Sequence, residues 1–147
     1  MGDDGLGLAA LERLRAGWRF DPPAMLVDGG TWGMNLLHEI EDAERVLLID
    51  AIHADRAPGT LIVLERTELP RFFAMKLSPH QIDMKEVLAV AELRGTLPDR
   101  TVAIGLQPER VELSTELSPA VRDGAASLVA RIIRQLEHWG HQAVPLS

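Results

Sequence analysis

The stretch RVLLIDAIHADRAPGT at residues 45–60 decides the fold. Its residues 46–49 are an uninterrupted apolar run, too short to cross a membrane and without the alternation of a half-exposed strand. Such a run is typical of a strand buried on both faces, as in the parallel sheet of an α/β domain. Asp50 follows where that strand should end, and open α/β sheets bind ligands beyond the carboxyl ends of their strands. Asp50 is therefore a site candidate, with the capping of a loop or turn as the equally common alternative.

Length and composition indicate one globular domain over residues 1–147, with 46% hydrophobic and 25% charged residues. The net charge of −7 and the lack of a basic block argue against nucleic acid and anionic membranes as partners. Because cysteine is absent, disulfides, thiolate metal sites and a cysteine nucleophile are excluded. No apolar segment approaches the roughly 18 residues of a membrane helix, and no signal-peptide pattern is present. We expect a cytoplasmic protein without membrane insertion.

Apolar spacing and turn residues predict an alternation of helices and strands. The predicted helices span residues 5–16, 32–41, 79–93 and 119–139, and the predicted strands span residues 24–27, 46–49, 61–64 and 101–106. This order predicts an α/β fold, a three-layer α/β/α sandwich with a mainly parallel twisted sheet. A helix that begins at Gly5 should follow a strand, so the first central strand is expected to be missing from this chain.

Helical spacing also identifies part of the core. The residues expected to face it from the first two helices are Leu11, Leu14, Trp18, Met34, Leu37 and Ile40. The last helix has clear end signals, with Ser118 before Pro119 at its start and Gly140 at its end.

Four polar residues fall at predicted helix starts or strand ends that should share one rim of the sheet: Asp4, Asp28, Asp50 and His80. At a helix N-terminus the dipole favours a carboxylate and disfavours imidazolium, so His80 should be neutral. Carboxylates and one neutral imidazole suit a divalent metal of borderline hardness. The same groups could instead include an aspartic dyad, which requires two carboxylates in contact. Taken singly, Asp50 is equally common in a structural role, and Asp4 and His80 are more often structural.

Seven short motifs follow one another along essentially the whole chain. They are GDDGLG at residues 2–7, DGGTWGMNLL at 28–37, IDAI at 49–52, APGT at 57–60, SPHQ at 78–81, IGLQP at 104–108 and LSP at 117–119. In these motifs and their order the sequence resembles the hydrogenase maturation endopeptidases, which process the large subunits of [NiFe]-hydrogenases. One such motif has little specificity, but seven in this order are a strong signal.

The resemblance implies a nickel-dependent endopeptidase of the aspartic-type grouping. It would remove a C-terminal extension from the [NiFe]-hydrogenase large-subunit precursor after nickel insertion. Family members bind the nickel, which the precursor supplies, through positions that match Asp4, Asp50 and His80. The first is commonly Glu, so Asp4 is a shorter ligand arm. Asp50 and Asp28 are the implied catalytic acids, and we expect a monomer.

Other interpretations remain open. A non-cleaving docking or checkpoint module would bind the same nickel-loaded precursor without cutting it. A flavodoxin-like small-molecule binder would need a phosphate-cradling loop after a first strand, which this chain does not supply. His53 could shield or tune the site beside Asp50, although a solvated loop residue is more common. In the family a buried strand precedes GDDGLG, so we expect the natural protein to be longer at its beginning.

Overall fold

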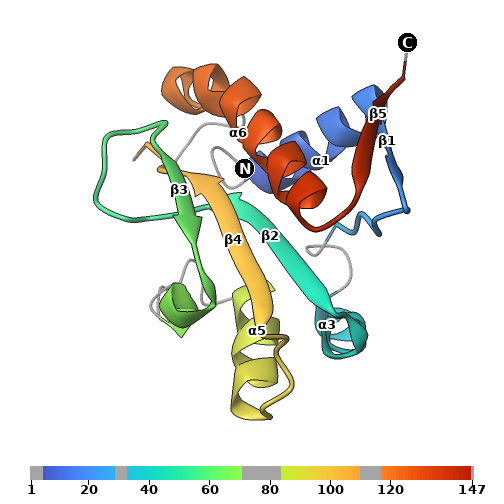
Figure 1. Ribbon diagram of the computed structural model, residues 1–147. Coiled ribbons are helices and arrows are strands. Elements are labelled where there is room, and N and C mark those ends of the chain that lie inside the picture. The colour runs from blue at the N-terminus through green and yellow to red at the C-terminus, as the bar shows by residue number, and fades with distance from the viewer. Residues whose placement is uncertain (1–4, 29–32, 71–83, 110–116, 147) are drawn as a thin grey trace. The chain divides into compact units, whose positions relative to one another are not determined.

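The computed structural model describes residues 5–28, 33–70, 84–109 and 117–146 (Figure 1). Its helices and strands in chain order are α1 (Leu6–Gly17), β1 (Trp18–Asp21), the 3₁₀ helix η2 (Gly33–Asn35), α3 (Leu36–Asp42), β2 (Arg45–Ala51), β3 (Leu61–Leu64), the 3₁₀ helix η3 (Arg66–Glu68), α5 (Met84–Leu93), β4 (Arg100–Leu106), α6 (Pro119–His138) and β5 (Gln142–Pro145). Helices and strands therefore alternate over most of the chain, as the α/β prediction requires.

The larger sheet has the strand order β2-β4-β3. The ends of β2 and β4 lie side by side, because the backbone N–H of Ile52 donates to the carbonyl of Leu106 at 3.0 Å. These two strands are consequently parallel. The N–H of Gln107, directly after β4, donates at 2.9 Å to the carbonyl of Thr60, directly before β3. β3 therefore runs antiparallel to β4, and the sheet is mixed.

The prediction that residues 46–49 are buried on both faces holds only in part. In β2 only Leu48 and Ala51 are buried, and the other residues are half-buried. In β4, by contrast, every residue from Thr101 to Leu106 is buried. The difference follows from position in the sheet, because β4 has a strand on each side and β2 is an edge strand among the described residues.

A second sheet consists of β1 and β5, which pair antiparallel with Trp18 opposite Pro145 and Asp21 opposite Gln142. The sequence predicted neither strand. Trp18 was expected on the buried stripe of the first helix, but it ends α1 with an extended backbone (φ −144°, ψ 156°). That prediction was wrong because Trp18 pairs with a strand from the other end of the chain, a partner that helical spacing cannot reveal.

The predicted strand at residues 24–27 is also wrong, since residues 23–28 form neither helix nor strand. The carbonyl of Leu26 accepts a hydrogen bond from the Arg15 guanidinium (Nη2, 2.7 Å). Met25 is 64% exposed, so this apolar segment does not contribute a core strand. Asp28 therefore does not follow a strand, contrary to prediction.

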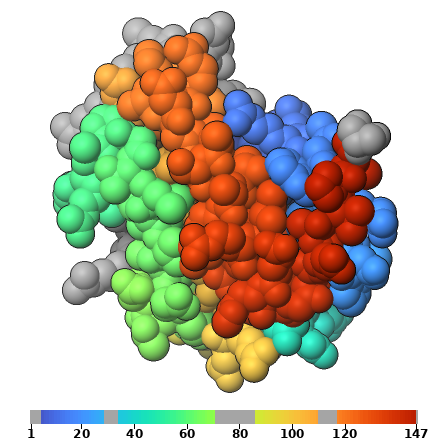
Figure 2. Space-filling model, turned by 45° about the horizontal axis from the view of Figure 1, so that its top comes forward, coloured from blue at the N-terminus to red at the C-terminus, as the bar shows by residue number. Residues whose placement is uncertain are grey.

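The chain divides into two compact units. The first contains Met1–Val27, Ile49–Ile62 and Ile104–Ser147, and the second contains Asp28–Leu48 and Val63–Ala103. In the first unit, α6 packs beside α1 and β5, as Figure 2 shows on the face that it displays. Leu14, Leu128 and Ile132 are fully buried. The single domain and the missing first strand stay predictions.

In the second unit, α3 packs against α5. α3 begins at Leu36, later than predicted, and its buried residues are Leu36 and Ile40. Met34 was expected in the core but is 40% exposed. The reason is the 3₁₀ helix η2, whose period of three residues places Met34 on a different face from that of a continuous α-helix.

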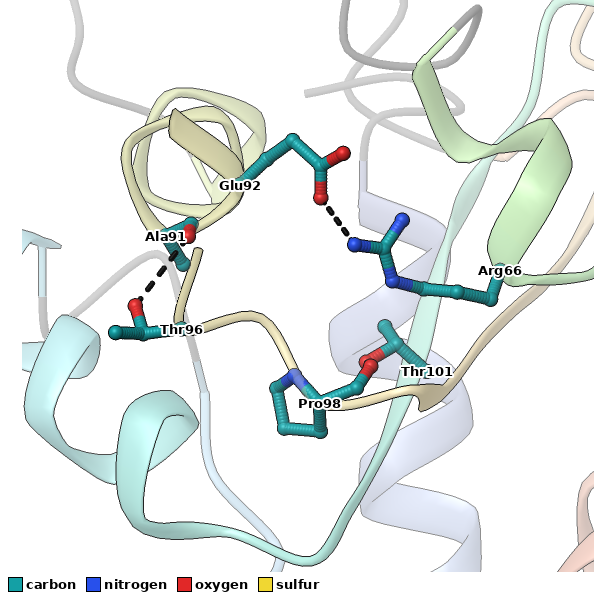
Figure 3. Close-up of polar contacts among 6 residues, drawn as sticks. All are labelled: Arg66, Ala91, Glu92, Thr96, Pro98 and Thr101. Atoms are coloured by element: carbon teal, nitrogen blue, oxygen red, sulfur yellow. Dashed lines mark hydrogen bonds and ion pairs between the residues drawn. The ribbon is translucent and has the colours of Figure 1, made fainter. Parts of the chain in front are cut away.

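Polar contacts in the second unit tie α5 to its surroundings. Arg66 pairs with Glu92, and the Thr96 hydroxyl donates to the carbonyl of Ala91 (3.3 Å), as Figure 3 shows. The Glu41 carboxylate accepts from the Arg94 guanidinium (Nε, 2.8 Å) and from the Thr96 hydroxyl. These hydrogen bonds surround the C-terminal end of α5.

None of the described helices is long and apolar enough to cross a membrane.

Candidate functional site

Asp50 lies where the sequence predicts it, one residue before the end of β2. Its side chain is half-buried, and its Oδ1 accepts a hydrogen bond from the backbone N–H of Ala51 at 2.8 Å. Because the loop that follows leaves the sheet, Asp50 occupies the carboxyl-end position at which α/β sheets bind ligands.

Two glycines from other parts of the chain lie against the backbone around Asp50. A Cβ atom on Gly105 of β4 would lie 1.8 Å from the carbonyl oxygen of Asp50, and one on Gly7 of α1 would lie 2.5 Å from that of Ile49. Neither distance leaves room for an added carbon, so both positions require glycine or a shift of the main chain. The GDDGLG, IDAI and IGLQP motifs thus meet at the end of β2.

The loop after β2 is held by Gln107, which follows β4 directly. Its carboxamide oxygen Oε1 accepts from the backbone N–H of Ala54 (2.7 Å) and of Arg56 (3.3 Å). Its backbone carbonyl accepts from the N–H of Gly59 at 2.8 Å. The sequence did not single out this residue for function, although the IGLQP motif that contains it was a signal.

The APGT motif also lies against the start of α6, directly after the LSP motif. A Cβ on Gly59, whose φ is +85°, would lie 2.6 Å from the carbonyl oxygen of Ala120 in α6. Ser118 caps α6 as predicted, with its hydroxyl oxygen accepting from the N–H of Val121 at 3.4 Å. Four of the seven motifs therefore contribute contacts around the end of β2 and the loop that follows it, and the residue after a fifth, LSP, contacts this loop.

The other predicted site residues have different outcomes. Asp28 belongs to the second unit and is half-buried. Asp4 and His80 lie outside the described residues, so the predicted set of metal ligands, Asp4, Asp50 and His80, stays a prediction. Within the described ranges, no three His, Asp or Glu side chains lie close enough together to hold a metal ion. His53 is half-buried in the loop after β2.

Residues 9–135 match the family model for hydrogenase maturation proteases (HycI). The hydrogenase expression/formation protein HoxM of Cupriavidus necator is 38% identical over 145 residues, which cover 97% of this chain and 72% of that protein. The hydrogenase 2 maturation protease of Escherichia coli is 30% identical over 144 residues, which cover 97% and 88%.

Solved structures give the same result. The hydrogenase maturating endopeptidase HybD from Escherichia coli superposes with a TM-score of 0.86 at 29% identity, covering 99% of this chain and 90% of that one. This likeness confirms the α/β fold class predicted from the sequence. Since the family model spans most of the chain and HoxM is similar over nearly all of it, the chain belongs to the hydrogenase maturation protease family.

Proposed function

We propose that this protein is a nickel-dependent endopeptidase that removes the C-terminal extension of a [NiFe]-hydrogenase large-subunit precursor after nickel insertion. Membership of the maturation protease family supports a peptidase that acts on a hydrogenase precursor. The observation that carries the proposal is the position of Asp50 at the carboxyl end of β2. There the motif glycines Gly7 and Gly105 allow helix α1 and strand β4 to approach its backbone closely.

In this proposal, the nickel of the precursor is part of the substrate and is bound by Asp4, Asp50 and His80. Two carboxylates and one neutral imidazole offset a 2+ charge and suit a metal of borderline hardness. Asp4 precedes Gly7 by three residues, and Gly7 lies against Ile49, which supports including Asp4 in the set. The metal would anchor the precursor and polarise the scissile carbonyl as a Lewis acid.

The attacking group in this proposal is water, and Asp28 is the candidate for its activation. A carboxylate can act as general base when it lies within hydrogen-bond reach of the water in the bound complex. Because the chain has no cysteine and the proposal uses no serine nucleophile, inhibitors of serine and cysteine proteases should leave the activity unchanged.

The test is to incubate the purified protein with nickel-loaded precursor and to weigh the products by mass spectrometry. We expect one cut that shortens the precursor at its C-terminus, and no cut when the precursor lacks nickel. Asp50→Ala and His80→Ala should abolish cleavage, whereas Asp4→Glu should keep it because it restores the commoner residue of the family. Asp123→Asn, which changes an exposed carboxylate of α6, is the matched control and should cut normally.

Each outcome separates one hypothesis from another. Binding of the nickel-loaded precursor without any change of mass would favour the docking or checkpoint module. Equal cleavage of nickel-free precursor, or full activity of the His80→Ala protein, would contradict the nickel-dependent mechanism.

A further inference from the structure

Gln107 is a buried polar residue whose hydrogen-bonding groups are almost all used on one loop. The residue is only 8% exposed, and its carboxamide oxygen accepts hydrogen bonds from the backbone N–H groups of Ala54 and Arg56. Its backbone N–H and carbonyl bond to Thr60 and Gly59 at the other end of the same loop. One residue after β4 therefore fixes both ends of the loop that connects β2 to β3.

The hydrogen bond of the amide nitrogen determines the orientation of the Gln107 carboxamide. Nε2 donates to the carbonyl of Pro108 at 3.2 Å, an acceptor that only the amide nitrogen can satisfy. The oxygen consequently faces the two loop N–H groups. Buried polar atoms are stable only when they are paired, and loss of the amide would also leave the part-buried N–H groups of Ala54 and Arg56 without this acceptor.

The two N–H groups lie on either side of an unusual residue. Asp55 has a φ of +56°, a left-handed conformation that side-chain-bearing residues seldom adopt. Ala54 precedes Asp55 and Arg56 follows it, so the Gln107 oxygen binds the backbone directly before and after this residue. Such a conformation persists when the surroundings hold it, and the Gln107 carboxamide binds the backbone on both sides of Asp55.

The anchoring of Asp50 is separate from that of the loop. The end of β2 is held by the backbone bond from Ile52 to Leu106 and by the close approach of Gly105 to the Asp50 carbonyl. Neither contact involves the Gln107 side chain. Removing that side chain should therefore change the shape of the loop and leave the position of Asp50 largely unchanged.

We propose that Gln107 is a positioning residue that holds loop residues 53–57 in the shape that docks the precursor beside Asp50. This inference rests on the proposed function, because the precursor is the molecule that the loop would contact. Asp55 and Arg56 are exposed and supply polar groups for a peptide chain, and His53 lies at the start of the segment. The hydrogen bonds between the Gln107 carboxamide and the loop, here called the clamp, thus affect substrate binding, whereas Asp50 takes part in the cleavage step.

The experiment combines kinetics with amide hydrogen exchange. Gln107→Met keeps the side-chain length but removes both ends of the amide, and Gln107→Glu keeps the acceptor oxygen. For Gln107→Met we expect KM for nickel-loaded precursor to rise about tenfold, as for the loss of one or two net hydrogen bonds, with kcat within about twofold. The amides of Ala54 and Arg56 should exchange faster, while that of Ile52 should not. Gln107→Glu should retain more of this protection than Gln107→Met, because its carboxylate can still accept from both loop N–H groups although it loses the bond to Pro108.

Gln135 in α6 supplies the matched control. It is as buried as Gln107, at 7% exposed, and its carboxamide accepts from Arg131 at 3.2 Å. Gln135→Met should alter neither KM nor the exchange of the Ala54 amide. If Gln107→Met does not fold, Gln107→Asn, which is one methylene too short to reach the loop, replaces it.

The outcomes distinguish this inference from the proposed function. Unchanged exchange at Ala54 and Arg56 would show that Gln107 does not hold the loop. Faster exchange with an unchanged KM, or a fall in kcat alone, would show that the loop does not dock the precursor. If the wild-type protein neither cuts nor binds nickel-loaded precursor, the proposed function and the docking role both fail, and exchange still decides whether the clamp exists.

Discussion

The two compact units hold their structure by different means. In the first unit, the carbonyl oxygens of Asp50 and Ala120 occupy positions where a Cβ of Gly105 or Gly59 would lie. In the second unit, α5 is tied to its neighbours by polar side chains, of which Arg66 and Glu92 are 27% and 35% exposed. Close backbone packing tolerates no added atom, whereas partly exposed ion pairs contribute little each. Substitutions should therefore cost far more around the candidate site than around α5.

The largest effect is expected at Gly105. Gly105→Ala would place a carbon 1.8 Å from the Asp50 carbonyl oxygen, so β2 and β4 would have to separate at their ends. We expect a loss of about 3 kcal/mol or more in the free energy of unfolding, measured by urea denaturation. Gly17→Ala, which meets nothing within 4 Å, is the matched control and should be close to neutral. A Gly105→Ala protein as stable as wild type would contradict the expectation that substitutions cost more stability around the candidate site than around α5.

A smaller effect is expected at Gly59, where two costs can be separated. Gly59→Ala combines a positive φ of +85° with a contact of 2.6 Å to the Ala120 carbonyl oxygen. Gly140→Ala has a similar φ of +98° but meets nothing within 4 Å. We expect a loss of about 1–2 kcal/mol for Gly140→Ala and about 1 kcal/mol or more beyond that for Gly59→Ala. Thermal and urea unfolding of both variants provide the measurement. If Gly59→Ala and Gly140→Ala lose the same stability, crowding against Ala120 does not contribute.

In the second unit, the Glu41 contacts should make stability depend on pH. The hydrogen bond from Thr96, followed by the hydrogen bond and charge of Arg94, holds the pKa of Glu41 below its usual value of 4.5. A lowered pKa stabilises the folded state above pH 4.5, and this contribution disappears as the pH falls through the folded-state pKa. Glu41→Gln should therefore be less stable than wild type at neutral pH, with the difference shrinking below pH 4.5. Urea midpoints across that range provide the measurement, and a constant difference would contradict the assignment.

The smallest effect is expected for Arg66. Its pair with Glu92 is partly exposed, and its Nε is buried without a hydrogen-bond partner among the described residues. Arg66→Met loses the ion pair but also removes that unpaired donor, so the two changes should nearly cancel. We expect a change within about 1 kcal/mol of the wild-type stability, measured by urea denaturation. A loss as large as that of Gly59→Ala would show that the second unit relies on this ion pair more than its exposure suggests.

The sequence by itself determined the features that depend on local chemistry. Ser118 and Pro119 predicted the start of α6, and Gly140 predicted its end, because capping and a positive φ are properties of a few neighbouring residues. The apolar run before Asp50 predicted both β2 and the position of this carboxylate at its carboxyl end. The order of these segments was enough to predict the α/β class.

Only the tertiary structure decided which distant segments meet. Trp18 pairs with Pro145 at the other end of the chain, and the half-buried state of β2 depends on its place in the sheet. The same holds for Gly105 against Asp50 and for Gln107 on the loop after β2. The physical reason is that a residue's own sequence neighbourhood sets its backbone preference, whereas strand pairing, burial and hydrogen bonds between segments are set by what the folded chain brings beside it.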